Sequence, residues 1–362
     1  MTEARLRPDQ ALVLLALSEN SIRSTGPHGE APTSATEIEL TYPERKRLKA
    51  LGGTAAIVMH YQSDWSRAQV EGMQAEFARL GIEVVAVTEA GFQPDRQVAD
   101  LAAASAKRPG VVVSIPTDPV VTANAYRSIA AQGSKLVFID NVPAGFAAGR
   151  DYVTVVAADN SGNGIASAHL LAKALDGRGD VAMVQHNADF FVTRQRADAF
   201  AETIETDYPG IRIVAREGVD GPDFAAEAEA VALRLIAVQP DLAGIWAVWD
   251  VPAAGVMVAA RAAGRNDLVV TTIDLGLEVA VELARGGIIK GVAAQRPYDA
   301  GVTEALLAGY ALLGKAAPPF VALPTLPVTA GNVLAAWDEI YRRPAPAALA
   351  IAATPAGDDP RT

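Results

Sequence analysis

The 362-residue chain contains no cysteine. This absence excludes catalytic thiols, thiolate metal sites and disulfides. Basic residues are also scarce: 31 Lys plus Arg stand against 42 Asp plus Glu, which gives a formal net charge of -11. Because proteins that bind nucleic acid neutralise phosphates over an extended basic surface, this balance argues against a nucleic-acid partner.

Long hydrophobic runs are missing as well. No apolar stretch approaches the roughly 20 residues that a transmembrane helix needs. Two arginines precede an apolar run at 11–17, but this run is at the short limit for a signal peptide and no convincing cleavage motif follows it. Residues 1–50 are predicted to form an N-terminal arm or linker, and the Pro/Ala-rich residues 343–362 a flexible tail.

The sequence motifs of enzymes and of nucleotide-binding proteins are absent. Neither GxGxxG nor GxxxxGK[ST] occurs, so no nucleotide cofactor is expected, and the segment DNSGNG is interpreted as a crossover loop that caps a helix. There is no GxSxG elbow and no HExxH pair. His60 and His169 are expected to be core or surface residues rather than catalysts. We therefore predict a protein that is not an enzyme and uses no cofactor.

What the chain does contain is a regular alternation of apolar runs and amphipathic helical segments. Near-continuous apolar strands that alternate with helices are typical of parallel sheets covered on both faces, so the predicted fold class is doubly wound α/β. This number of strands fits two sheets of about five better than one very wide sheet. The predicted strands are 54–61, 82–90, 110–116, 135–140, 152–159, 179–186, 211–218, 244–250, 268–274 and 288–295.

Polar and aromatic residues occur repeatedly where these strands end. Examples are Tyr61, Asp140, Trp249 with Asp250, Asp274 and Gln295. In open parallel sheets the carboxyl ends of the strands form the ligand-binding crevice. Carboxylates accept paired hydrogen bonds from vicinal hydroxyls, arginine donates a fixed fork, and tryptophan covers apolar C–H faces. This combination favours an uncharged ligand that carries several hydroxyl groups.

From about residue 51 to residue 342 the chain resembles the periplasmic sugar-binding proteins of the ribose-binding type. The order and spacing of the segments carry the resemblance. They are HYQSDWSRAQVEGMQAEFARLG, FIDN, AADNSGNGIASAHLLAKAL, TRQRADAF, QPDLAGIWAVWD, TTIDLG, AAQRPYDAG and PTLPVTAGNVLAAWDEIY. The resemblance implies two lobes joined by three crossing segments. Lobe 1 would comprise 51–158 plus 296–322, and lobe 2 would comprise 159–295 plus 323–342.

The resemblance also implies a set of ligand-binding residues. Trp65 would stack on the sugar, Arg194 would clamp it, and Asn141 stands where the family usually has an arginine after the aspartate. This departure removes one guanidinium and leaves the identity of the ligand open. The complete set is Gln62, Asp64, Trp65, Asp140, Asn141, Arg194, Trp249, Asp250, Asp274 and Gln295.

Several of these residues have an ordinary structural alternative. Asp140, Asp250 and Asp274 could each cap the helix that follows, because aspartate is a preferred N-cap residue. Trp65 could pack against the surface without contacting a ligand. Phe190 and Phe191 lie in a loop where an aromatic ring could meet the ligand or serve local packing.

By this resemblance the chain is expected to be the solute-binding protein of an ABC uptake system. It would bind a small uncharged sugar or sugar alcohol, with a lean towards the polyol, close on it as a monomer and deliver it to an ABC permease. A periplasmic or extracellular location is implied. The alternative is a cytoplasmic ligand-sensing domain related to sugar-responsive repressors, although residues 1–50 contain no recognisable helix-turn-helix.

Overall fold

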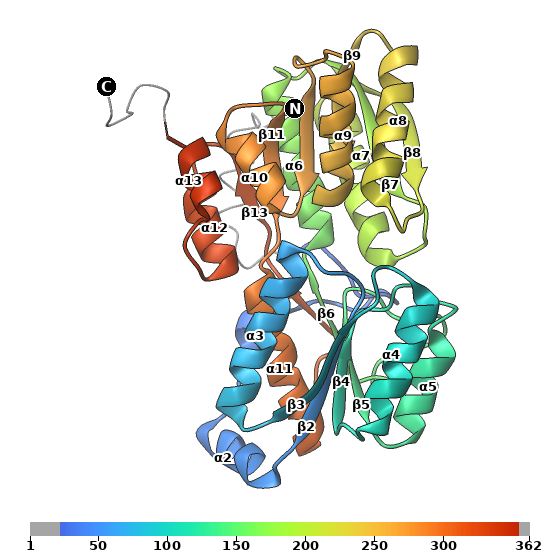
Figure 1. Ribbon diagram of the computed structural model, residues 1–362, viewed down its shortest axis with the longest axis vertical. Helices are drawn as coiled ribbons and strands as arrows, with labels where there is room; N and C mark the ends of the chain where they lie inside the picture. Colours follow the sequence, from blue (N-terminus) through green and yellow to red (C-terminus); the bar gives the residue numbers. More distant parts are fainter. Residues whose placement is uncertain (1–21, 355–362) are drawn as a thin grey trace, which may run out of the picture.

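The computed structural model describes residues 22–354 and shows two lobes stacked along the long axis of the molecule (Figure 1). The sheet of the first lobe is entirely parallel. Its strand order is β1(Thr33–Ser34), β12(Phe320–Leu323), β6(Thr154–Ala158), β5(Lys135–Ile139), β4(Val111–Ser114), β2(Thr54–Met59) and β3(Glu83–Glu89). Strands such as β4 and β6 are buried along their whole length, as expected for strands covered on both faces.

The sheet of the second lobe is parallel except for one antiparallel edge strand. Its order is β13(Leu326–Val328), β11(Ile289–Ala294), β10(Val269–Ile273), β9(Leu242–Ala247), β7(Gly179–His186) and β8(Ile211–Val219), with β13 antiparallel to β11. The predicted doubly wound α/β class is confirmed.

Helices cover both faces of each sheet (Figure 1). In the first lobe these are α2(Tyr42–Leu51), α3(Asp64–Leu80) and α11(Pro297–Leu313) on one face, and α4(Pro94–Ala106) and α5(Ala123–Ala131) on the other. In the second lobe, α6(Asn160–Ala174) and α7(Phe191–Asp207) lie opposite α8(Phe224–Val238), α9(Asp250–Ala262), α10(Leu277–Ala284) and α12(Val333–Tyr341).

The chain passes between the two sheets three times. The crossings lie between β6 and α6, between β11 and α11, and between β12 and β13. Each lobe is therefore assembled from segments that are far apart in the sequence. A ligand site at the lobe boundary sits beside all three connections, which places it close to the axis about which the lobes could rotate.

Within residues 22–50, part of the segment that we expected to be an arm belongs to the first lobe. Thr33 and Ser34 pair with β12, and helix α2 buries Leu48 completely. The physical reason is a capping box, in which Thr41 and Glu44 exchange hydrogen bonds at the start of α2. Composition alone hides such a signal, because the residues around it are polar.

The C-terminal segment also contains structure. Helix α13(Ala347–Ala352) packs against α10 and buries Leu349 completely, so residues 343–354 are not a loose tail. Residues 1–21, with the apolar run considered as a signal peptide, and residues 355–362 lie outside the described part of the chain. Within 22–354, no helix combines the length and the hydrophobicity that crossing a membrane requires.

The two lobes touch each other across their boundary. Phe92 of the first lobe meets Phe224 of the second edge to face, with 4.8 Å between ring centroids. The Asp64 carboxylate accepts a 3.0 Å hydrogen bond from the backbone N–H of Leu277, at the start of α10. Ala68 of α3 packs into the hydrophobic core of the second lobe. The two lobes are therefore in direct contact beside the cavity that lies between them.

Candidate functional site

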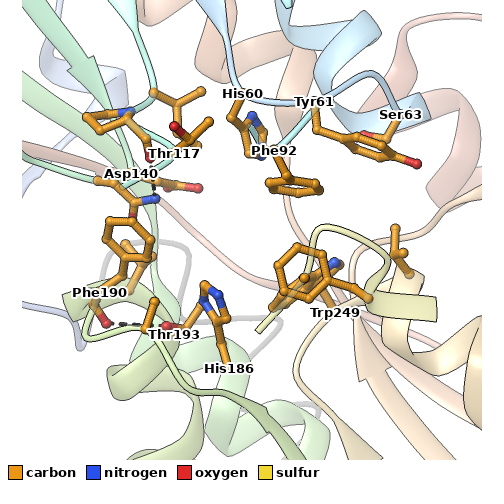
Figure 2. Close-up of a pocket in the computed structure, with 18 of the residues that line it drawn as sticks. His60, Tyr61, Ser63, Phe92, Thr117, Asp140, His186, Phe190, Thr193 and Trp249 are labelled. Carbon is orange, nitrogen blue, oxygen red and sulfur yellow. Dashed lines mark hydrogen bonds between the residues drawn. The ribbon is translucent and has the colours of Figure 1, made fainter. Parts of the chain in front are cut away.

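A cavity of about 300 Å³ lies between the lobes, at the carboxyl ends of strands from both sheets (Figure 2). Strand ends meet there because every strand of the first sheet and every strand but β13 of the second run parallel, so their final residues converge on one edge of each sheet. The site is thus positioned by topology, and the side chains that follow each strand determine its chemistry.

The first lobe contributes residues that follow β2, β3, β4 and β5. His60 and Tyr61 come from the end of β2, Phe92 follows β3, and Asp140 follows β5. Asp140 has a φ of 50°, in the left-handed region that is costly for a residue with a side chain. A 2.8 Å hydrogen bond from its N–H to the carbonyl of Val156 fixes this turn. The carboxylate is thereby directed to the lobe boundary (Figure 2).

The second lobe supplies a matching set. His186 is the last residue of β7, Trp249 precedes α9 with Asp250 as the first residue of that helix, Asp274 follows β10 and Gln295 follows β11. Asp274 repeats the backbone geometry of Asp140, with a φ of 68°. Two buried aspartates on neighbouring faces of the cleft thus share a conformation that a simple helix cap does not require.

Most of the predicted ligand-binding residues line this cavity. They are Trp65, Asp140, Asn141, Trp249, Asp250, Asp274 and Gln295. Gln62 and Asp64 instead line an adjoining open groove, where Asp64 pairs with Arg67 at 2.5 Å in addition to capping α10. These two residues therefore contribute to the boundary between the lobes rather than to the cavity.

Arg194 does not line the cavity, and Arg196 takes the place expected for it. Arg194 is half exposed and forms an ion pair with Asp189. Arg196 is only 4% exposed; its Nε donates to Asn160 at 2.7 Å and its Nη1 to the carbonyl of Val248 at 3.4 Å. The prediction of Arg194 is corrected by helix geometry, since residues two apart in α7 face nearly opposite sides.

Helical spacing in the sequence could have identified Arg196. Val192, Arg196 and Phe200 recur at intervals of four, and all three are buried, so the arginine belongs to the apolar stripe of α7. An arginine in such a stripe needs polar partners inside the protein, which makes it a candidate for a site.

Aromatic side chains form much of the remaining wall. Two of them, Phe92 and Phe224, were not predicted from the sequence. Tyr61 stacks on Phe92 with 4.6 Å between centroids, and Phe224 contacts Trp249 at 5.0 Å and His186 at 5.3 Å. Of the two phenylalanines considered earlier, Phe190 lines the cavity, whereas Phe191 packs against Phe320. Phe92 and Phe224 lie in loops or at a helix start, where no periodicity marks a residue as buried.

The ionisable groups of the cavity are strongly affected by burial. Burial raises the pKa of Asp140 to about 6, although the nearby Arg196 charge opposes the shift, and it raises the pKa of Asp274 to about 6 as well. The pKa of Asp250 is raised to about 8, first by burial and then by the charges of Asp274 and Asp64.

The two histidines of the cavity are neutral at pH 7. Burial lowers the pKa of His60 to about 3 and that of His186 to about 4. His60 had been expected in the core or on the surface, but it lines the cavity, with its ring edge to face against Trp65 and Phe92. Within residues 22–354, no group of three His, Cys, Asp or Glu side chains could hold a metal ion.

The sequence of the chain matches a known protein family. Residues 55–316 match the model of a family described as periplasmic binding protein domain. The chain belongs to this family. No curated protein sequence matches it.

Solved structures of periplasmic binding proteins share the fold. An ABC transporter solute-binding protein from Agrobacterium vitis, bound with α-D-tagatopyranose, has a TM-score of 0.71 and 23% identity, and the match covers 78% of this chain and 96% of that one. A carbohydrate transporter solute-binding protein from Agrobacterium radiobacter, in complex with D-arabinose, has a TM-score of 0.69 and 22% identity over 77% and 95%. A second Agrobacterium vitis protein, with bound allitol, has a TM-score of 0.67 and 24% identity over 78% and 97%.

A periplasmic binding protein binds its solute and does not transform it, so this chain is not an enzyme. The cavity agrees with that role chemically. Its acidic and basic side chains are arranged as hydrogen-bond acceptors and donors around a partly open cleft. Its aromatic walls exclude water, which strengthens polar contacts made inside it.

Proposed function

We propose that the chain is the solute-binding protein of an ABC uptake system and that it binds a small sugar or sugar alcohol between its lobes. The observation that carries the proposal is a pair of buried acceptors on the cavity wall. Asp274 Oδ1 and Asn141 Oδ1 have no hydrogen-bond partner within the described residues, and both side chains line the cavity. A buried acceptor without a partner is costly, and the hydroxyl groups of a ligand would satisfy it.

The cavity also fits the shape and polarity of a sugar. About 300 Å³ is at the lower end of the range of small-molecule sites, which favours one sugar unit over an oligosaccharide. Asp140, Arg196 and Gln295 supply donors and acceptors for hydroxyls, while Trp65 and Trp249 can cover C–H faces. The bound tagatose, arabinose and allitol of the similar structures support this ligand class.

Delivery to a membrane permease follows from the same proposal. The chain would bind its ligand in the periplasm or outside the cell and present the closed form, as a monomer, to an ABC permease. Cell fractionation followed by N-terminal sequencing tests the location. A full-length chain recovered from the cytoplasm would favour a ligand-sensing role over transport.

Calorimetric titration of the purified protein tests the ligand class. The panel should contain pentoses, hexoses, ketohexoses and polyols of four to six carbons, with amino acids and dicarboxylic acids as controls. We expect at least one sugar or polyol to bind with a dissociation constant in the micromolar range or below. Binding confined to the control classes would contradict the proposal.

A further inference from the structure

The charges around the cavity do not balance. Among the described residues that line the cavity, Arg196 is the only positively charged side chain. The two histidines of the cavity, His60 and His186, are neutral because burial lowers the pKa of each. Five carboxylates line the same space. They are Asp118, Asp140, Asp220, Asp250 and Asp274. At pH 7 the pKa of about 8 leaves Asp250 mostly protonated in the ligand-free protein. A neutral sugar can satisfy the hydrogen bonds of these groups, but it supplies no positive charge that would favour ionisation of Asp250.

The imbalance is concentrated at one end. Arg196 acts electrostatically on Asp140 and Asp274, and it stabilises the charged form of both. The charged groups that act on Asp250 are Asp274 and Asp64, and both are anionic. Backbone N–H groups of Val251 and Gly276 stabilise the Asp250 carboxylate but carry no full charge. Asp274 therefore lies between Asp140, whose charged form Arg196 stabilises, and Asp250, whose charged form no cavity-lining cation stabilises. A cationic group on a ligand would favour the ionised form of Asp250.

An independent observation points to a missing donor at this place. Asp274 is 7% exposed, and its Oδ1 atom has no hydrogen-bond partner within the described residues. The Gln295 side chain stabilises the charged form of this carboxylate, and because the carboxylate lines the cavity, a donor on a ligand would satisfy its remaining oxygen. A protonated amine offers three donors together with a positive charge.

The aromatic residues near Asp250 suit a cation as well. Trp249 precedes Asp250 in the chain. Tyr61 and Asp250 both line the cavity and the adjoining groove. Tyr61 is in turn stacked on Phe92. Aromatic faces attract an ammonium group, and the attraction is larger in desolvated sites.

We propose that the preferred ligand is a sugar or polyol that carries a protonated amino group, and that this group binds between Asp250 and Asp274. Its hydroxyls then bind at the opposite end, near Asp140, Asn141 and Arg196. The inference rests on the proposed function and narrows its ligand class. A charged ligand differs from the uncharged one that the sequence favours. The difference arises because the sequence does not show which carboxylates lie near the buried guanidinium of Arg196.

Matched ligand pairs test the proposal by calorimetry at pH 7 and low ionic strength. Suitable pairs are D-glucosamine with D-glucose, D-galactosamine with D-galactose, and 1-amino-1-deoxy-D-glucitol with D-glucitol, with the neutral N-acetylated amino sugars as a further control. In at least one pair the amine should bind about tenfold more tightly than its neutral counterpart, and acetylation should remove the advantage.

Asp250→Asn is the deciding variant, since the amide keeps the size and one acceptor but cannot ionise when an ammonium group binds beside it. It should weaken binding of the amine about tenfold more than binding of its neutral partner, so that the preference for the amine disappears. Asp223→Asn is the matched control, because Asp223 caps α8 outside the cavity and should leave the preference intact. Thermal unfolding of each variant verifies folding.

The outcomes separate this inference from the proposed function. Neutral sugars that bind as tightly as their amines would overturn the amine proposal and leave sugar binding standing. An amine preference that survives in Asp250→Asn would overturn the assignment to Asp250. If no sugar, polyol or amino derivative binds, the proposed function itself fails.

Discussion

Arg196 is held in its place by two hydrogen bonds from its guanidinium group. Nε donates to the side chain of Asn160, the first residue of α6, and Nη1 donates to the carbonyl of Val248, which follows β9. These bonds use two of the five donors of an arginine and fix the orientation of the planar group. The side chain is therefore preorganised for a ligand before the ligand arrives.

The arginine pair of α7 provides a direct test. Arg196→Ala should weaken binding of the best ligand by about 2 kcal/mol or more, because ligand hydroxyls and the neighbouring Asp140 would lose a charged partner. Arg194→Ala should bind like the parent, since Arg194 is half exposed and pairs with Asp189. Calorimetry on both variants checks this. Equal losses in the two would show that α7 acts through its fold and not through one side chain.

Asp250 should make the stability of the ligand-free protein depend on pH. Its pKa is raised to about 8, whereas an unfolded aspartate titrates near 3.9. Between these values the folded state holds a proton that the unfolded chain has released, so the contribution of Asp250 to stability falls as pH rises from about 4 to 8.

The comparison with Asp250→Asn isolates this effect. The free energy of unfolding of the parent, minus that of the variant, should decrease as pH rises through the same window, because asparagine does not titrate. Urea unfolding at a series of pH values measures it. A difference that does not change with pH would mean that Asp250 is ionised throughout.

At the scale of secondary-structure elements, Asp159 joins three parts of the fold. It caps α6 by accepting a 3.0 Å bond from the N–H of Gly162, and it accepts further bonds from the N–H groups of Arg23 and Ser24 and from the Ser24 hydroxyl. The residue is 3% exposed and lies where the chain first crosses between the lobes. One carboxylate thus fixes the crossing to the N-terminal segment.

Asp159→Ala should therefore destabilise the protein more than removal of an ordinary cap does. We expect a loss of about 2 to 4 kcal/mol, because several buried donors lose their acceptor. Asp223→Ala, which removes the cap of α8, should cost about 1 kcal/mol. Urea unfolding of both variants tests the difference. Similar losses would show that the bonds to Arg23 and Ser24 contribute little.

The elements differ in how well the sequence predicts them. Long apolar strands such as 54–61 and 179–186 were predicted close to their observed bounds, since a buried parallel strand shows as a continuous apolar run. The two residues of β1 and the three of β13 are too short to carry any period, and they become strands only through their neighbours. Helix α13 was likewise hidden in a Pro/Ala-rich segment.

Parallel topology also determines which cavity residues the sequence can predict. Asp140, Asp274 and Gln295 line the cavity as predicted because parallel topology brings strand ends together, whatever the rest of the fold does. Phe92 could not be predicted, because its position depends on a left-handed turn with φ 57° and on a partner in the other lobe. Contacts between lobes depend on three-dimensional closure, which local sequence does not encode.

For the whole molecule, closure depends on several separate contacts across the lobe boundary. Besides the Phe92–Phe224 pair and the Asp64–Leu277 bond, Phe191 packs on Phe320, Arg342 pairs with Asp299 at 2.7 Å, and Arg343 approaches Glu71 at 3.5 Å. An aromatic pair contributes about 0.5 to 1.5 kcal/mol and an exposed ion pair less than about 1 kcal/mol. These energies are small enough for a bound ligand to control the balance between open and closed forms.

Ligand binding should accordingly shorten the distance between the lobes. The absence of cysteine allows site-specific spin labels at Val120→Cys in the first lobe and Leu233→Cys in the second, both on exposed side chains. Saturating ligand should shift the label distances to shorter values. It should also reduce the radius of gyration measured by solution scattering. Burial of Trp65 and Trp249 should change the tryptophan fluorescence. Phe92→Ala should keep more of the protein open and weaken binding up to about tenfold, because closure then lacks the aromatic pair. Label distances that stay the same while calorimetry shows binding would mean that the cavity is a rigid pocket and that the three crossing segments do not act as hinges.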